Sequence, residues 1–187
     1  MTDLSLRLRS CGVVGAGGAG FPAYVKAQAR AEIVIVNAAE CEPLLHKDKE
    51  LLTHYQAGVL EGLRQLMGAV GARRGIVAIK EKYATRIDAL EKALVDEPRI
   101  EVARLGDFYP AGDEVITIFE TTGRVVPPGG LPLDVGCVVS NVETLLNMAR
   151  GEVVTHKYLT VAGLVPEPVT VRAPLGIRFK DLLAHVG

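Results

Sequence analysis

The sequence predicts an α/β protein in which an open parallel sheet carries helices on both faces, a Rossmann-like arrangement. Short apolar runs rich in β-branched residues alternate along the chain with longer amphipathic segments. This alternation favours parallel strands that are joined by right-handed crossovers. A glycine-rich segment precedes the first of these strands, and polar residues directly follow several of them. Because ligands of open α/β sheets bind beyond the carboxyl ends of the strands, these segments form the candidate site.

The chain begins with a short predicted helix and a glycine-rich loop. Apolar residues recur at helical spacing between residues 3 and 11, and residues 15–20 then hold four glycines in six positions. Glycines permit positive φ, so successive N–H groups can converge on an anion. Pro22 fits the first turn of a helix, whose N-terminus would add to a phosphate site. The alternative is a turn without a ligand, because no buried strand precedes the glycines as in a dinucleotide-binding fingerprint.

The middle of the chain predicts a β-α-β-α-β unit. Residues 32–37 contain the continuous β-branched run Ile33-Val34-Ile35-Val36, which is typical of a strand buried on both faces. Further strands are expected at residues 76–79 and 100–105, with helices over residues 47–70 and from about residue 83 to Pro98. The apolar stripe of the longer helix consists of Leu51, Tyr55, Val59, Leu63, Leu66 and Val70.

A fourth strand follows at residues 135–139, after a short helix over residues 112–121 and a loop rich in proline and glycine. Ser140 and Glu143 match the S-x-x-E capping pattern, which predicts that the next helix opens there. The apolar face of this helix continues to Gly151.

Two domains are predicted, with the boundary after residue 151. Residues 1–151 form the α/β domain, and residues 152–187 form the start of a small β-grasp module. Alternating residues at 157–163 and 168–172 predict a hairpin in this module, and a short helix is expected at 179–186. A hairpin with one helix is small for a free-standing domain, so we expect the natural protein to continue beyond this chain.

Composition disfavours several classes of function. The chain has 21 Lys and Arg against 22 Asp and Glu, and it has no Trp, which argues against nucleic-acid binding. No apolar run approaches the roughly 20 residues of a membrane helix, and the N-terminus lacks an apolar signal core, so a cytoplasmic location is expected. The 3 cysteines are scattered without a C-x-x-C pair, and the histidines lack metal-like spacing. We therefore expect neither a disulfide framework nor a metal site here.

Three loops should meet the glycine-rich segment at the carboxyl edge of the sheet. They are residues 37–43, 106–114 and 140–144. Backbone amides and Lys26 would bind a phosphate, whereas Asn37 and Asn141 suit a polar ring edge or a ribityl chain. Carboxylates of the loops would accept hydrogen bonds from hydroxyls or a carboxamide. The candidate binding residues are Gly15, Gly17, Gly18, Gly20, Lys26, Asn37, Glu40, Glu42, Tyr109, Gly112, Asp113, Glu114, Asn141, Glu143 and Thr144.

Several of these side chains have a simpler interpretation when each is taken alone. Asp113, Glu114 and Glu143 fall in first turns of predicted helices, where the helix dipole favours acids. Lys26 could be a solvated side chain, and Tyr109 could pack in a turn against the core. The convergence of four loops is what favours a binding site.

Four motifs in this order resemble the NADH-binding flavoprotein family, which includes the flavoprotein subunit of respiratory complex I and the C subunit of Rnf ferredoxin:NAD oxidoreductases. The motifs are GAGGAGFPAYVK at residues 15–26, NAAECEP at 37–43, YPAGDE at 109–114 and NVET at 141–144. The third motif and residues 126–136 most resemble the cobalamin reductases of propanediol-utilisation microcompartments. The resemblance covers nearly the whole chain, which is identified as an N-terminal fragment of such a protein.

The resemblance implies noncovalently bound FMN with NADH stacking over it. Electrons would pass from NADH through FMN to [4Fe–4S] clusters in a missing C-terminal part, and then to a corrinoid or ferredoxin, in the cytoplasm or a microcompartment lumen. No residue is needed as an acid or base. By motif matching, Glu42 and Tyr109 face the dinucleotide. FMN contacts fall on Gly15, Gly17, Gly18, Lys26, Asn37, Glu40, Gly112, Glu114, Asn141 and Thr144.

The chain departs from the complex I pattern in the half of the site that would face NADH. Ala39 stands where those proteins have an aspartate, and Asp113-Glu114 replaces a Glu-Glu pair. Two other functions stay open. One is a structural docking module with a vestigial nucleotide site. The other is a nucleotide-binding transferase, which the absence of a G-K-[ST] ending disfavours.

Overall fold

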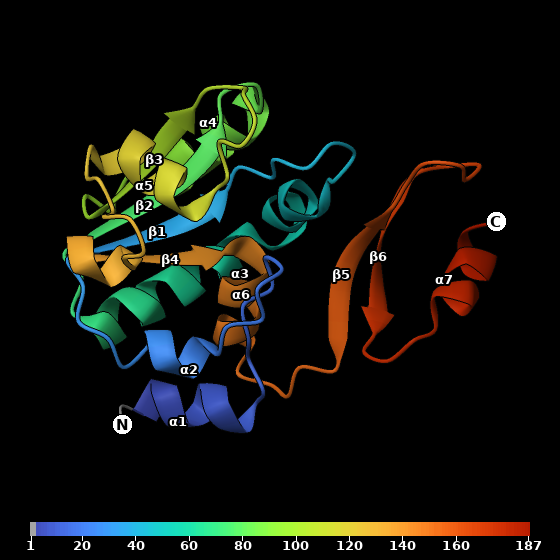
Figure 1. Cartoon of the computed structure of the whole chain (residues 1–187), viewed down its shortest axis with the longest axis horizontal. Coiled ribbons are helices and arrows are strands. Elements are labelled where there is room, and N and C mark those ends of the chain that lie inside the picture. Colours follow the sequence, from blue (N-terminus) through green and yellow to red (C-terminus); the bar gives the residue numbers. More distant parts are fainter. Residues whose placement is uncertain (1–2) are drawn as a thin grey trace.

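Four parallel strands form the central sheet of the computed structural model, which describes residues 3–187. The strand order is β3-β2-β1-β4, and helices cover both faces, as predicted (Figure 1). The strands are β1 (Ile33–Ala38), β2 (Arg74–Lys80), β3 (Ile100–Leu105) and β4 (Cys137–Asn141).

The two faces of the sheet bury separate hydrophobic clusters because side chains alternate along each strand. Val34 and Val36 of β1 point to the larger cluster, and Ile33 and Ile35 point to the smaller one. The larger cluster includes α1 (Asp3–Ser10), α2 (Ala23–Lys26), α3 (Lys47–Val70), α4 (Ala84–Ala93) and α6 (Val142–Arg150). The smaller cluster includes Ile118 of α5 (Glu114–Thr122), and Val135 of the 3-10 turn η1 (Pro132–Val135) packs against it.

The order of the strands creates a switch point between β1 and β4. The chain builds β1, β2 and β3 in one direction and then returns to place β4 on the other side of β1. Asn37 and Asn141 are register partners at the carboxyl ends of these two neighbouring strands. This is where open α/β sheets bind their ligands.

The C-terminal hairpin forms a second sheet that stands beside α3 and α6 (Figure 1). Strands β5 (His156–Val161) and β6 (Val169–Pro174) are antiparallel, and α7 (Phe179–Val186) follows them, in agreement with the predicted hairpin and helix. Val161, Ala173 and Leu182 form its small core. The assignment of this segment to a β-grasp domain stays a prediction.

Three local expectations were wrong. Ser140 belongs to β4, and the N-cap of α6 is Asn141, whose side chain accepts from the Glu143 amide, so the predicted capping box does not form. Pro22 is the N-cap of α2 rather than a first-turn residue, and that helix is a single turn of 4 residues. Tyr55 leaves the apolar stripe because α3 kinks there, at φ −133° and ψ 25°, and 41% of its surface is exposed.

Candidate functional site

A cavity of about 880 Å³ opens at the carboxyl ends of β1 and β4. It unites the four loops that the sequence placed there, because the switch point leaves room above these strands. The predicted residues that line it are Gly15, Gly17, Gly18, Lys26, Asn37, Glu40, Glu42, Tyr109, Gly112, Asp113, Glu114 and Asn141.

The glycine-rich loop turns its backbone toward this cavity. The Gly15 amide donates to the Phe21 carbonyl at 2.7 Å, and the Gly20 amide donates to the Gly15 carbonyl at 3.2 Å, which closes the loop. Gly18 and Gly20 adopt φ of 122° and 64°, which other residues rarely do. Within residues 3–187, no acceptor pairs with the amides of residues 17–19. Three adjacent N–H groups are therefore available to an anion in the cavity.

Two glycines allow close approach of segments that are distant in the sequence. A Cβ on Gly17 would lie 3.4 Å from the Asn141 Cβ. A Cβ on Gly112 would lie 2.9 Å from the Cys41 sulfur, and the Gly112 amide points at that sulfur. These positions bring the loop before α2 and the loops after β1, β3 and β4 around one space.

Asn37 and Lys26 line the cavity and connect the loops around it. The Asn37 side-chain amide donates to the Gly112 carbonyl at 2.7 Å and accepts from the Ala39 amide at 3.2 Å. Lys26 donates to the Val139 carbonyl at 2.6 Å and lies 3.6 Å from the Glu114 carboxylate. The Lys26 ammonium is therefore bound to the backbone of β4, and the interpretation as a solvated side chain is wrong.

Glu40 caps α3 from the neighbouring loop. Its carboxylate accepts from the amides of Asp48 at 2.8 Å and Lys49 at 3.3 Å, and its own φ is 43°. The N-cap residue His46 supplies no side-chain bond, so Glu40 satisfies two amides that an α-helix leaves free. Burial raises the pKa of Glu40, and the nearby Asp48 charge adds to this, although the two backbone bonds oppose it.

The two acids of the third motif serve different purposes. The Asp113 carboxylate accepts from the amides of Val115 and Ile116 at 3.0 and 3.1 Å, so Asp113 is the N-cap of α5 and precedes its first turn. Glu114 instead reaches toward Lys26. Tyr109 is 69% exposed, so the alternative that it packs against the core is wrong.

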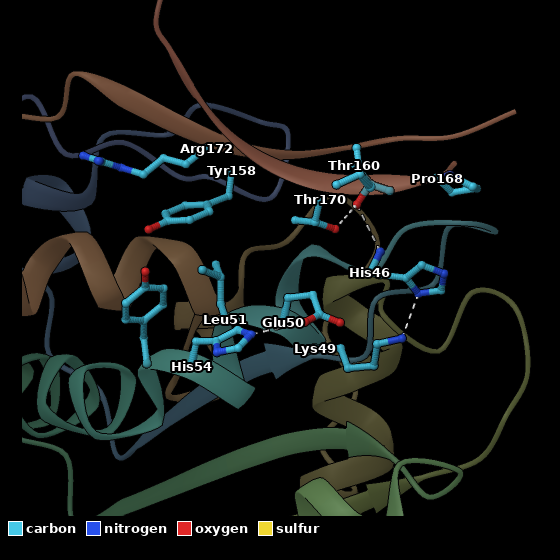
Figure 2. Close-up of a pocket in the computed structure, with 12 residues that line it drawn as sticks. His46, Lys49, Glu50, Leu51, His54, Tyr158, Thr160, Pro168, Thr170 and Arg172 are labelled. Atoms are coloured by element: carbon cyan, nitrogen blue, oxygen red, sulfur yellow. Dashed lines mark hydrogen bonds and ion pairs between the residues drawn. The ribbon is translucent and has the colours of Figure 1, made fainter. Parts of the chain in front are cut away.

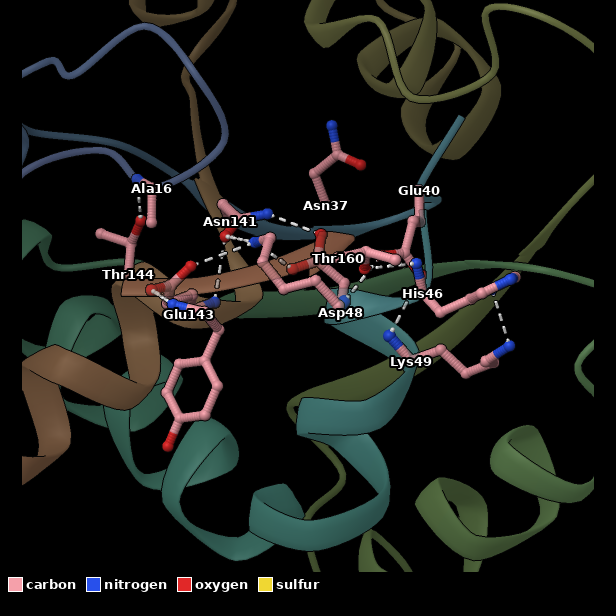
Figure 3. Close-up of polar contacts among 12 residues, drawn as sticks. Ala16, Asn37, Glu40, His46, Asp48, Lys49, Asn141, Glu143, Thr144 and Thr160 are labelled. Carbon is pink, nitrogen blue, oxygen red and sulfur yellow. Dashed lines mark hydrogen bonds and ion pairs between the residues drawn. The ribbon is translucent and has the colours of Figure 1, made fainter. Parts of the chain in front are cut away.

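A buried cluster of charged and polar groups forms part of the cavity wall, because Lys47, Asp48 and Asn141 line the cavity (Figure 3). The Asn141 amide donates to Asp48 at 2.7 Å, and Lys47 pairs with Asp48 at 2.7 Å and with Glu143 at 3.2 Å. Glu143 is 1% exposed and Asp48 is 5% exposed. Burial lowers the pKa of Lys47, but the two carboxylates outweigh it and leave that pKa raised.

Strand β5 completes this cluster. Lys157 donates to the Ala16 carbonyl at 2.9 Å and pairs with Glu143, and the Tyr158 amide donates to Glu143 at 3.0 Å. Burial and the Lys47 charge lower the pKa of Lys157 despite this pairing. The hairpin is therefore in direct contact with the glycine-rich loop.

Three predicted residues lie outside the cavity lining. Gly20 shapes the loop, Thr144 accepts from the Ala16 amide at 2.9 Å, and Glu143 is committed to the buried cluster. Lys47, Asp48 and Lys157 also line the cavity and were not predicted. Lys47 and Asp48 lie four and five residues after the end of the second motif, whereas Lys157 offered no local signal.

A second cavity, of about 510 Å³, separates the hairpin from α3 (Figure 2). His46, Lys49 and His54 face it from the α3 side, and Thr160 and Arg172 face it from the hairpin. The His46 amide donates to the Thr160 hydroxyl at 3.2 Å, which joins the two walls. Tyr158 and Thr160 line both cavities, so β5 forms their shared wall.

Two properties of residues 3–187 bear on the class of site. None of their helices is both long enough and apolar enough to cross a bilayer. No group of three or more His, Cys, Asp or Glu side chains among them is arranged to hold a metal ion.

Comparison with known proteins places this geometry in context. Residues 8–150 match the family described as the Nuo51 FMN-binding domain. The chain is 51% identical over 189 aligned residues to the cobalamin reductase PduS of Salmonella typhimurium, covering 99% of this chain and 42% of that protein. It is 36% identical to a component of the Na⁺-translocating ferredoxin:NAD⁺ oxidoreductase complex of Acetobacterium woodii, covering 95% of this chain and 42% of that component.

A solved structure has a similar fold and a related sequence. The crystal structure of an NAD⁺-reducing [NiFe]-hydrogenase in the air-oxidized state aligns with a TM-score of 0.85 and 28% identity, over 98% of this chain and 38% of that chain. The present chain thus spans about two fifths of the length of the curated relatives it matches.

Proposed function

Because this chain belongs to the Nuo51 FMN-binding domain family, a family of flavin-linked electron-transfer oxidoreductases, we propose that its cavity binds FMN. The observation that carries the proposal is the row of three amides at residues 17–19, which have no acceptor within residues 3–187 and lie beside the switch point of the sheet. Backbone N–H groups that converge without a protein acceptor suit a phosphate. The cavity volume of about 880 Å³ also lies in the usual range for sites of drug-sized ligands.

We propose that different lining residues contact the phosphate, the ribityl chain and the ring of FMN. The glycine-rich loop and the ammonium of Lys26 would hold the phosphate. Asn141 stands beside Gly17 and would bind the ribityl chain, while Asn37 and the Gly112 backbone would face the ring edge. Amide side chains suit these contacts because they both donate and accept hydrogen bonds.

We further propose that the chain passes electrons from NADH through FMN toward iron–sulfur centres outside it. Bound FMN would accept two electrons together and could release them one at a time. Tyr109 and Glu42 are exposed at the rim, where they would orient the dinucleotide. The relatives act as a cobalamin reductase and as part of a ferredoxin:NAD⁺ oxidoreductase complex, so a corrinoid or ferredoxin is the proposed final acceptor.

The partners and location follow from the same family. Proposed partners are NADH and an iron–sulfur region or acceptor protein with [4Fe–4S] clusters, with no role for nucleic acid. The cytoplasm or the lumen of a bacterial microcompartment is the proposed location.

Titration with FMN and with riboflavin tests the binding site. We expect quenching of flavin fluorescence at micromolar FMN and at least tenfold weaker binding of riboflavin, which lacks the phosphate that the free amides would hold. In Gly17→Val, the new side chain would press on Asn141 and fill the loop, so FMN affinity should fall at least tenfold.

The matched control is Gly68→Val, because Gly68 is exposed on α3 and a Cβ there meets nothing within 4 Å. This variant should bind FMN like the parent chain. Absence of FMN binding by the parent chain would reject the proposal and favour the docking module. Once FMN is bound, anaerobic addition of NADH should bleach the flavin absorbance if NADH is the donor.

A further inference from the structure

We propose that Lys157 is a positioning residue for the glycine-rich loop, which makes strand β5 of the hairpin a working part of the flavin site. The inference rests on the proposed FMN site and extends it to a segment beyond the residues 8–150 that match the family. It starts from the contact between the Lys157 ammonium and the Ala16 carbonyl at 2.9 Å.

This contact fixes the direction of a free amide. The bond between residues 16 and 17 is a trans peptide, so the Ala16 C=O and the Gly17 N–H point in opposite directions. When the Lys157 ammonium holds the Ala16 oxygen, the Gly17 N–H therefore points away from that ammonium. Gly17 lines the cavity, and its N–H is the first of the three amides that lack an acceptor within residues 3–187.

The preceding peptide group is held by a different element. The Ala16 N–H donates to the Thr144 hydroxyl at 2.9 Å, at the start of α6 (Figure 3). Two consecutive peptide groups of the loop are thus fixed, one by α6 and one by β5. Such a loop loses little conformational entropy when a ligand arrives, which favours tight binding.

Glu143 keeps the Lys157 side chain in place. A lysine on its own is a flexible stem, but the Glu143 carboxylate is 1% exposed and pairs with the ammonium. The other carboxylate oxygen accepts from the Tyr158 amide at 3.0 Å, so the same group also ties down the backbone of β5. Lys47 supplies the second positive charge and Asp48 the second negative charge of the cluster.

Flavin titration of three variants of the full 187-residue chain tests the inference. Lys157→Met removes the charge and the bond to Ala16, and we expect FMN binding to weaken about tenfold while riboflavin binding changes less than threefold. Lys157→Arg keeps a charged donor and should recover most of the FMN affinity. Lys180→Met is the matched control, since Lys180 is exposed on α7 and its side chain makes no hydrogen bond or ion pair with residues 3–187.

The difference between the two flavins separates positioning from general damage. If the hairpin only stabilises the fold, Lys157→Met should weaken the binding of FMN and of riboflavin equally. That result would overturn the inference. FMN affinity within twofold of the parent in folded Lys157→Met would also overturn it.

Amide hydrogen exchange gives a second measurement that needs no flavin. In Lys157→Met, the bonded amides of Gly15, Ala16 and Gly20 should exchange at least tenfold faster, and unchanged exchange would reject the positioning role. If the parent chain fails to bind FMN, the proposed function fails, but exchange of these amides still decides whether Lys157 holds the loop. If Lys157→Met folds less stably, exchange of these amides is measured in Lys157→Arg, which retains the charge and should protect them as the parent chain does.

Discussion

Glu40 occupies a position where a helix and a ligand could both use its carboxylate. It lines the cavity, yet both of its oxygens already accept amides of α3. A glutamate at φ 43° is uncommon, and the surrounding contacts must maintain it. The family resemblance assigns Glu40 to FMN, whereas the contacts within the chain make it first a cap of the helix that carries Lys47 and Asp48.

Glu40→Gln should change how stability depends on pH. The pKa of Glu40 is raised above 4.5 in the folded chain, mainly by burial, so the folded state holds this proton more tightly than the unfolded state. Its contribution to stability is therefore full below the unfolded pKa and declines as the pH rises through the folded pKa. Glutamine does not titrate and still offers one oxygen to the α3 amides.

Urea unfolding of both chains at pH 4 and at pH 7 measures this effect. We expect the parent chain to lose stability relative to Glu40→Gln between the two values. If the parent chain instead gains stability relative to Glu40→Gln at pH 7, the hydrogen bonds from the α3 amides, rather than burial, would determine the pKa of Glu40.

At the scale of elements, the close contact between α3 and α6 decides where the buried charges lie. A Cβ on Gly62 would fall 2.0 Å from the Leu145 carbonyl oxygen, so the two helix backbones touch there. The N-termini of both helices reach the cavity end of the sheet, where Asp48 of α3 meets Asn141 at the start of α6. This helix contact therefore supports the floor of the site.

Three glycines of α3 allow a controlled test of that contact. Alanine has a higher helix propensity than glycine by about 1 kcal/mol, so each substitution brings the same local gain. Gly68→Ala meets open space and should raise the free energy of unfolding by up to about 1 kcal/mol. Gly58→Ala meets the movable Leu146 side chain and should be close to neutral. Gly62→Ala meets backbone and should cost about 3 kcal/mol.

Urea denaturation of the three variants supplies these values. Equal stability of Gly62→Ala and Gly68→Ala would contradict the close crossing of α3 and α6. Gly62 does not line the cavity. Loss of FMN affinity in a folded Gly62→Ala chain would therefore show that the contact between α3 and α6 also positions the floor of the site.

At the scale of the whole molecule, the sequence was enough to predict the loops at the carboxyl edge of the sheet, but not the buried charged cluster beside them. The alternation of strands and helices predicted that the loops with Asn37 and Asn141 leave the same edge of a parallel sheet. The structure adds that their strands, β1 and β4, are neighbours. Asn141 and Asp48 lie 93 residues apart, and nothing local in the sequence couples them. Glu143 fitted a capping pattern, but its partners come from the start of α3 and from β5, and both contacts depend on tertiary packing.

A cavity assembled from distant segments should couple ligand binding to global stability. The unfolded chain has no site, so FMN at 100 times its dissociation constant should stabilise the folded chain by about 2.7 kcal/mol. For a chain of 187 residues this corresponds to an increase of about 8 °C in Tm. Differential scanning calorimetry with and without FMN measures the shift.

Gly17→Val at the same FMN concentration is the control, because its fold is expected to survive while its loop is blocked. Riboflavin at that concentration should give a smaller shift than FMN, since the free amides at residues 17–19 would have no phosphate to hold. An equal rise in Tm for the parent chain and for Gly17→Val would place the flavin away from the glycine-rich loop. The cavity at the ends of β1 and β4 would then have to be abandoned as the flavin site.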